Sequence, residues 1–171
     1  MIAIAEPRTV VGSEDDQRVL VEPVLAQGLE DFAAGPIDFH HHIAEQAGGH
    51  GVECGIELLV TPGSEQVRAT IERDGQLSSL AKIKATTLAN ACGPCIGQWR
   101  REKVLEGVPN TIVTSYNRNF PRRNDGRSET MNFIASPEIV VALSLAGRLS
   151  FNPLTDTLVG EDGEEFKLEP P

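Results

Sequence analysis

The segment Cys92-Gly93-Pro94-Cys95 contains the residues best suited to chemistry in this sequence. Two cysteines three positions apart can bind one metal centre through their thiolates, or they can form a redox-active disulfide. The spacing alone does not decide between these chemistries. Three interpretations therefore compete: a thioredoxin-type dithiol, a zinc site and an iron–sulfur cluster.

The surrounding residues weigh against the first two interpretations. A redox dithiol needs a helix that starts at the first cysteine and continues past the second, and Gly97 interrupts such a helix soon after Cys95. Ala91 also stands where thioredoxin-type proteins usually have tryptophan. A closed zinc site needs four ligands, and the other candidates, Cys54 and the four histidines, do not repeat the spacing. An iron–sulfur cluster would take these two thiolates and a third from elsewhere.

The other residues with chemical potential lack a context that would give them a role. Cys54 is expected to be a half-buried free thiol rather than a ligand. The run His40–His42 follows Gly35-Pro36, and we expect these histidines to be exposed and without a metal. Trp99 is expected to pack near the cysteine loop.

The elements that must position these residues alternate between helices and strands, which is typical of an α/β fold. No element is expected before residue 42. The strongest helix, 136–146, has Ser136 as its cap, Pro137 at its first position and Gly147 at its end. Further helices are expected at 43–47, 64–74 and 77–84, strands at 56–61, 86–89 and 111–115, and a hairpin over 158–168 that turns at Asp162-Gly163.

Composition narrows the class of protein. The 171 residues suit one domain, and 40% hydrophobic residues supply a core. A formal charge of −10 argues against a general nucleic-acid binder, and the apolar runs are shorter than the ~20 residues of a membrane span. Three cysteines indicate reduced thiols or metal ligands in an intracellular protein. The N-terminal residues show neither a secretory signal nor a transit peptide.

Several blocks resemble the aconitase family in the same order along the chain. The cysteine segment and the segments around it match, as does a short motif near the end. The matching blocks are Val60–Gly75, Leu88–Trp99, Asn110–Phe120, Ala135–Val140 and Phe151–Pro153. The resemblance is to the mitochondrial type of the family, and it covers residues 43–171.

This resemblance implies a three-layer α/β/α domain of the aconitase iron–sulfur type. It also implies a hydro-lyase that isomerises citrate to isocitrate through cis-aconitate in the tricarboxylic acid cycle. A [4Fe–4S] cluster held by three cysteines acts as the Lewis acid in that family. The implied location is the mitochondrion, with the cytoplasm as the alternative.

The resemblance assigns roles to five residues. Cys92 and Cys95 match two of the three cluster ligands. Arg118 and Arg123 match arginines that bind substrate carboxylates, and Asn117 matches an asparagine near the cluster. Guanidinium groups bind carboxylates through two hydrogen bonds, so they suit a tricarboxylate substrate. Two further arginines, Arg122 and Arg127, lie close to Arg118 and Arg123 in the sequence, and they are expected to be surface charges.

Parts of the family pattern are missing. Residues 35–42 stand where the family has its first ligand cysteine, and no segment matches the swivelling domain with its serine base or the N-terminal domain with its Asp–His pairs. We therefore expect an unmatched, poorly ordered segment over 1–42, a partial aconitase-like domain over 43–171, and a fragment that is inactive alone and has no catalytic residue of its own. The alternatives are a fragment of homoaconitase and a non-catalytic remnant with a binding role.

Overall fold

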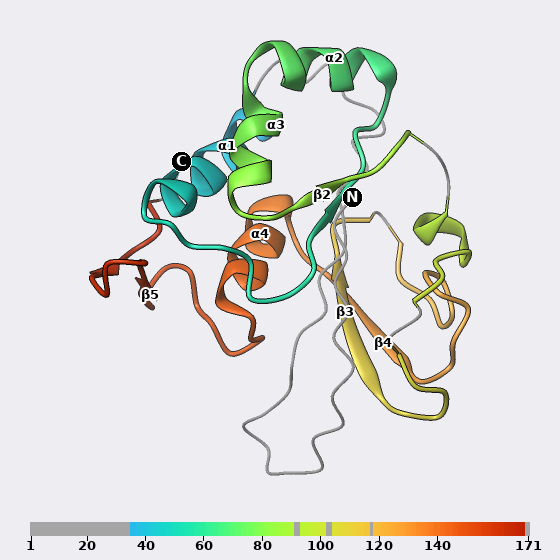
Figure 1. Cartoon of the computed structure of the whole chain (residues 1–171). Helices are drawn as coiled ribbons and strands as arrows, with labels where there is room; N and C mark the ends of the chain where they lie inside the picture. The colour runs from blue at the N-terminus through green and yellow to red at the C-terminus, as the bar shows by residue number, and fades with distance from the viewer. Residues whose placement is uncertain (1–34, 91–92, 102–103, 117, 170–171) are drawn as a thin grey trace.

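The computed structural model describes residues 35–90, 93–101, 104–116 and 118–169, with the side chains of 35–41 excepted. Helices and short strands alternate along this part of the chain, so the predicted mixed α/β class is confirmed (Figure 1). The elements are α1 (Gly35–Gly49), β1 (Leu59–Val60), α2 (Glu65–Arg73), α3 (Gln76–Lys82), β2 (Thr86–Thr87), the 3₁₀ turn η1 (Pro94–Ile96), β3 (Asn110–Thr114), β4 (Thr130–Ile134), α4 (Pro137–Ala146), β5 (Leu158–Val159) and β6 (Glu165–Phe166).

Helix α1 begins earlier than the sequence predicted. It starts at Gly35 instead of Ile43 and crosses position 42, while residues 1–34 lie outside the described part of the chain. Gly35-Pro36 does not prevent this early start, because proline is well tolerated in the first turn of a helix, where its missing N–H is not needed. The helix also ends later than predicted, at Gly49 instead of at residue 47.

Helices α2 and α4 form where the sequence predicted them. Ser64 caps α2, because its Oγ accepts a hydrogen bond from the N–H of Val67 at 3.1 Å. Pro137 opens α4, and Gly147 ends it with a φ of 68°, a conformation that glycine adopts without strain. Ser136 takes the N-cap position of α4, but its side chain makes no capping hydrogen bond. That detail of the prediction was wrong.

The strands form three separate pairs in the described residues. β1 pairs with β2 and β3 with β4, both in parallel, whereas β5 and β6 form the predicted antiparallel hairpin. Strand β4 was not predicted from the sequence. Its burial is the reverse of that of an ordinary one-sided strand, because Thr130 and Asn132 are half-buried while Met131, Phe133 and Ile134 are exposed. Its register pairs Asn110 with Thr130 and Thr114 with Ile134.

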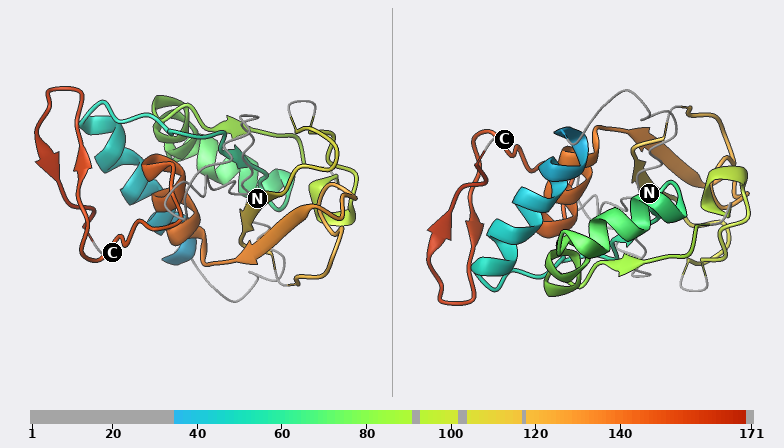
Figure 2. Two further views of the ribbon diagram at one scale, coloured as in Figure 1. Left: turned by 90° about the horizontal axis from the view of Figure 1, so that it is seen from below. Right: turned by 90° about the horizontal axis from the view of Figure 1, so that it is seen from above.

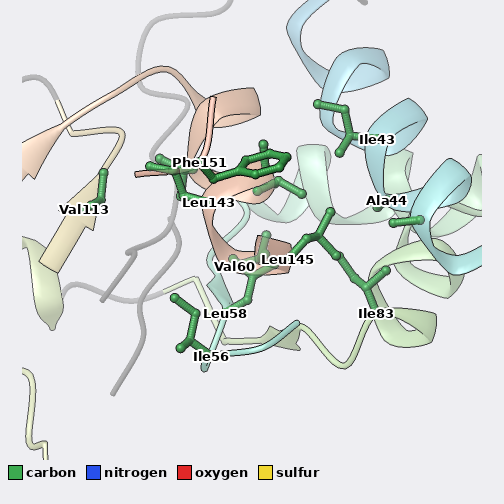
Figure 3. Packing of buried hydrophobic residues seen from close by; sticks show 14 of the residues in the cluster. Ile43, Ala44, Ile56, Leu58, Val60, Ile83, Val113, Leu143, Leu145 and Phe151 are labelled. Carbon is green, nitrogen blue, oxygen red and sulfur yellow. The ribbon is translucent and has the colours of Figure 1, made fainter. Parts of the chain in front are cut away.

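One hydrophobic core joins the helices to the strands. Side chains of α1, α4, the end of α3 and the chain around β1 converge in a single cluster (Figure 3). The pair β3–β4 extends from this cluster, and η1 lies at the opposite end of the molecule from the β5–β6 hairpin (Figures 1 and 2). No helix within the described ranges is long and apolar enough to cross a membrane.

Leu58 offers a test of this core, because its side chain is fully buried. Replacing Leu58 with alanine removes buried methyl groups and leaves a cavity, which costs about 2–5 kcal/mol of unfolding free energy. Urea denaturation followed by circular dichroism measures this loss. Leu154, which is 69% exposed, is the matched control, and its alanine variant should change stability by less than about 0.5 kcal/mol. Equal effects of the two variants would contradict the described core.

Candidate functional site

The cysteine segment forms a tight turn at one end of the molecule. Cys95 sits in η1 and is partly exposed, while Cys92 lies outside the described residues. The turn ends at Gly97, which has a φ of 80°. A Cβ at Gly97 would lie 3.3 Å and 3.4 Å from the carbonyl oxygens of Arg122 and Arg123. Both the backbone conformation and this close approach therefore require glycine.

Arg123 connects the cysteine turn to the segment that contains the arginines. Its Nε donates a hydrogen bond to the carbonyl oxygen of Cys95 at 3.3 Å, and its Nη1 donates to the carbonyl of Arg118. The guanidinium lies over the rings of Tyr116 and Phe120, with its Cζ 4.7 Å and 5.7 Å from the ring centroids. The structure thus brings two predicted site residues, Cys95 and Arg123, into direct contact.

The remaining arginines of this segment differ in environment. Arg118 and Arg122 are exposed, in agreement with a surface position for Arg122. Arg127 is half-buried, and its Nη1 donates to the carbonyl of Val104 at 2.8 Å, so its assignment as a plain surface charge was wrong. Asn117 lies outside the described residues.

A cleft of about 380 Å³ opens beside these arginines. It is lined by residues between 119 and 132, among them Arg122, Arg123 and Arg127, with Asp125 as the one carboxylate of the lining. Three guanidinium groups against one carboxylate make the cleft locally positive in an acidic chain. Such a cleft is suited to an anion.

A buried ion pair that the sequence did not predict lies next to this cleft. Nη1 of Arg101 is 2.9 Å from Oδ2 of Asp125, and both side chains are shielded from solvent. Arg101 belongs to a run of four charged residues at positions 100–103, a pattern typical of a solvent-exposed loop. No sequence signal distinguishes it from its charged neighbours.

The structure does not support the redox interpretation. The turn η1 spans only three residues and ends at Gly97, so no helix extends beyond Cys95 as a redox dithiol requires. Within the described ranges, no three His, Cys, Asp or Glu side chains are arranged to hold a metal ion. His42 is exposed, 3.9 Å from the carboxylate of Glu169, and the ring of His50 stacks on Phe166.

Cys54 is the half-buried thiol that the sequence predicted. Its backbone N–H donates to the carbonyl of Ile83, directly after α3, and its side chain packs against the core cluster. Burial of the thiol, with a smaller contribution from the neighbouring charge of Glu53, raises the pKa of Cys54 to about 12. A thiol with so high a pKa is a poor metal ligand, because metals bind the thiolate.

The cysteine turn fits the chemistry of an iron–sulfur cluster. Thiolates are the ligands that such clusters use, and Cys95 is accessible. A Cβ built at Gly93 would meet no described atom within 4 Å, so there is room beside the turn for a bulky group. Cys92 and Cys95 would supply two ligands, and the third is not among the described side chains.

The raised pKa of Cys54 predicts a pH dependence of its alkylation. The rate with iodoacetamide should increase about tenfold for each pH unit from about pH 8 to pH 11, because the thiolate fraction grows over that range. In urea the thiol should titrate near its ordinary value of about 8.5. Mass spectrometry of the peptide that contains Cys54 measures both rates. A plateau near pH 9 in the folded protein would contradict the burial of this thiol.

The same pKa difference makes stability depend on pH. A folded-state pKa above the unfolded value gives a contribution that is present below the unfolded pKa and is lost as the pH rises toward about 12. Chemical denaturation should therefore show that the unfolding free energy of the native chain falls relative to Cys54→Ala between about pH 9 and pH 11. Cys95→Ala serves as the matched control for the loss of a thiol.

Comparison with known proteins identifies the family. Residues 37–147 match the model of the "Aconitase family (aconitate hydratase)". Over 129 residues, 75% of this chain, it is 60% identical to the mitochondrial aconitate hydratases of Emericella nidulans and Gracilaria gracilis and 57% identical to that of Saccharomyces cerevisiae. The match spans only 16% of the Emericella protein and 17% of the other two. On these matches, the chain belongs to the aconitase family.

Proposed function

We propose that this chain is the part of an aconitase-type hydro-lyase that holds the iron–sulfur cluster loop and the arginines for the substrate carboxylates. The contact between Arg123 and the carbonyl of Cys95 is the observation that carries the proposal. It places a candidate cluster ligand directly beside a candidate carboxylate-binding group. The complete enzyme would isomerise citrate and isocitrate through cis-aconitate, and the mitochondrial names of the relatives support a mitochondrial location.

In this proposal, Cys92 and Cys95 hold a [4Fe–4S] cluster together with a third cysteine that this sequence does not contain, since its one remaining cysteine is the core thiol Cys54. When bound, the cluster supplies a Lewis acid that polarises the substrate hydroxyl and a carboxylate. Arg118 is exposed and free to turn its guanidinium toward a carboxylate, and Asn117 would lie beside the cluster. Arg123 would orient a second carboxylate while its Nε and Nη1 hold the loop in place.

We further propose that residues 43–171 form part of a three-layer α/β/α domain that is completed by the rest of the enzyme. The parallel pair β3–β4 supports this, because parallel sheets are normally covered on both faces. Met131, Phe133 and Ile134 on β4 are instead 44–48% exposed. The chain alone would lack both the third ligand and the catalytic base, so we expect it to be inactive by itself.

Cluster assembly tests the metal part of this proposal. Anaerobic reconstitution of the full chain with iron, sulfide and an excess of dithiothreitol, whose thiolate can take the place of the missing third ligand, should give visible absorbance and bound iron. Cys95→Ser should reduce both strongly, because a serine hydroxyl is a poor cluster ligand. Cys54→Ser is the matched control and should retain the cluster. Equal iron and sulfide content in all three proteins would count against Cys95 as a ligand.

Anion binding tests the substrate part. We expect titration calorimetry to detect citrate binding at low ionic strength, and Arg118→Gln to weaken it about tenfold, since one charge-assisted hydrogen bond contributes about 1.5 kcal/mol or more. Arg68→Gln, at an exposed position of α2 that does not line the cleft, is the control and should weaken binding much less. Similar losses in the two variants would indicate that the chain attracts citrate only through its overall charge.

A further inference from the structure

The ion pair between Arg101 and Asp125 is embedded in a network of hydrogen bonds. Nη1 of Arg101 also donates to Oδ1 of Asn110 at 2.6 Å, and Oγ1 of Thr130 donates to Oδ2 of Asp125 at 2.7 Å. The exposed fractions of the Arg101 and Asp125 side chains are 0% and 1%. Two charges can be buried in this way only when their geometry and additional hydrogen bonds compensate for lost hydration. The network therefore tolerates little displacement.

This network joins the candidate site to the sheet. Asn110 and Thr130 are the first register pair of β3 and β4, so they form a fixed platform. Arg101 follows the cysteine turn, and Asp125 belongs to the arginine segment. One buried ion pair thus connects both segments to the same point of the sheet.

The cysteine segment (here residues 93–101 together with Val104) and the arginine segment (residues 118–127) lie side by side in the same direction. Four links join them, in the same order along both segments. In the first, Nε of Arg123 donates to the carbonyl of Cys95, and in the second the backbone N–H of Trp99 donates to the carbonyl of Asn124. The third is the ion pair of Arg101 with Asp125, and in the fourth Nη1 of Arg127 donates to the carbonyl of Val104. Of these four links, only the third joins two ionised side chains. The other three have a backbone carbonyl as acceptor, and a neighbouring residue could offer a similar one after a shift in register.

We propose that the Arg101–Asp125 ion pair fixes the register of the cysteine segment against the arginine segment. Arg101 and Asp125 are positioning residues. The inference rests on the proposed function only for the identity of the group that the site binds. A carboxylate in a buried position accepts one geometry from a guanidinium, whereas a carbonyl can be exchanged for the next along the chain. The ion pair would therefore determine which carbonyl faces Arg123.

Trp99 is a natural probe for this proposal. It is the one tryptophan of the chain. Its backbone N–H donates a hydrogen bond to the carbonyl of Asn124 in the arginine segment, and the Cζ of Arg101 lies 5.0 Å from the centroid of its ring. Asp125→Asn leaves Arg101 over the ring but removes the charge that anchors it. We expect this variant to shift the Trp99 emission to the red and to increase its quenching by acrylamide.

Amide hydrogen exchange of the full chain separates local undocking from global loss of stability. In Asp125→Asn the Trp99 amide should exchange at least about tenfold faster than in the native chain. The Gly160 amide, which bonds to the carbonyl of Glu164 in the distant hairpin, should keep its rate. Arg148→Met, at an exposed ion pair with Asp156, is the control and should change neither rate.

A double variant keeps the test informative if an unpaired buried charge prevents folding. Arg101→Met with Asp125→Met leaves no buried charge, and such replacements are usually tolerated. We expect it to fold with native protection of Gly160 but with Trp99 still exchanging faster and more readily quenched, because methionine side chains impose no register. Native-like exchange and quenching of Trp99 in either variant would overturn the proposal.

The cluster experiment distinguishes this inference from the proposed function. If the native chain takes up no iron and sulfide, the proposed function fails, and fluorescence and exchange at Trp99 still decide the role of the ion pair. If the native chain binds a cluster and Asp125→Asn loses it while Gly160 stays protected, the positioning role is supported at the site itself.

Discussion

The organisation of the candidate site depends on the need of two buried guanidinium groups for hydrogen-bond acceptors. Arg101 and Arg123 are both almost fully shielded from solvent. A guanidinium in such a position needs acceptors from the protein, since an unpaired buried charge is strongly destabilising. The acceptors come from segments distant in sequence, namely Asp125 for Arg101 and the carbonyl of Cys95 for Arg123. These needs bring the cysteine and arginine segments together without any regular secondary structure between them.

The helical core supplies the rigidity that these loops lack. Helices α1, α3 and α4 pack around an aliphatic cluster, and β3 connects that cluster to the loops at the other end (Figures 1 and 3). The strand residues Ile112 and Val113 are buried in the core, while the first pair of the β3–β4 register holds the ion pair. The reactive groups therefore lie on loops, as is common for functional sites, and the scaffold fixes where those loops begin and end.

The molecule exposes apolar side chains beside the candidate site. The chain spans about one sixth of the length of its relatives, and the apolar side chains of β4 are exposed in it. Phe120, which lies over Arg123, is exposed as well. Phe120 and Met131 also line the positive cleft, so apolar surface is exposed on this side of the candidate site.

The sequence by itself determined the family, the α/β class and most helices, because these follow from local patterns. Ser64 at a helix cap, Pro137 at a helix start and the turn at Asp162-Gly163 act through neighbouring residues, and the structure places each of them as predicted. Short-range chemistry also identified Cys95 as a candidate ligand.

Only the tertiary structure decided the existence of β4 and the roles of Arg101, Asp125 and Arg127. Each depends on partners that are distant in sequence, such as β3 for β4 and Val104 for Arg127. A charged residue looks the same in a sequence whether it faces water or a buried carboxylate. The difference arises because burial removes hydration and makes the partner indispensable, and burial is a property of the folded chain.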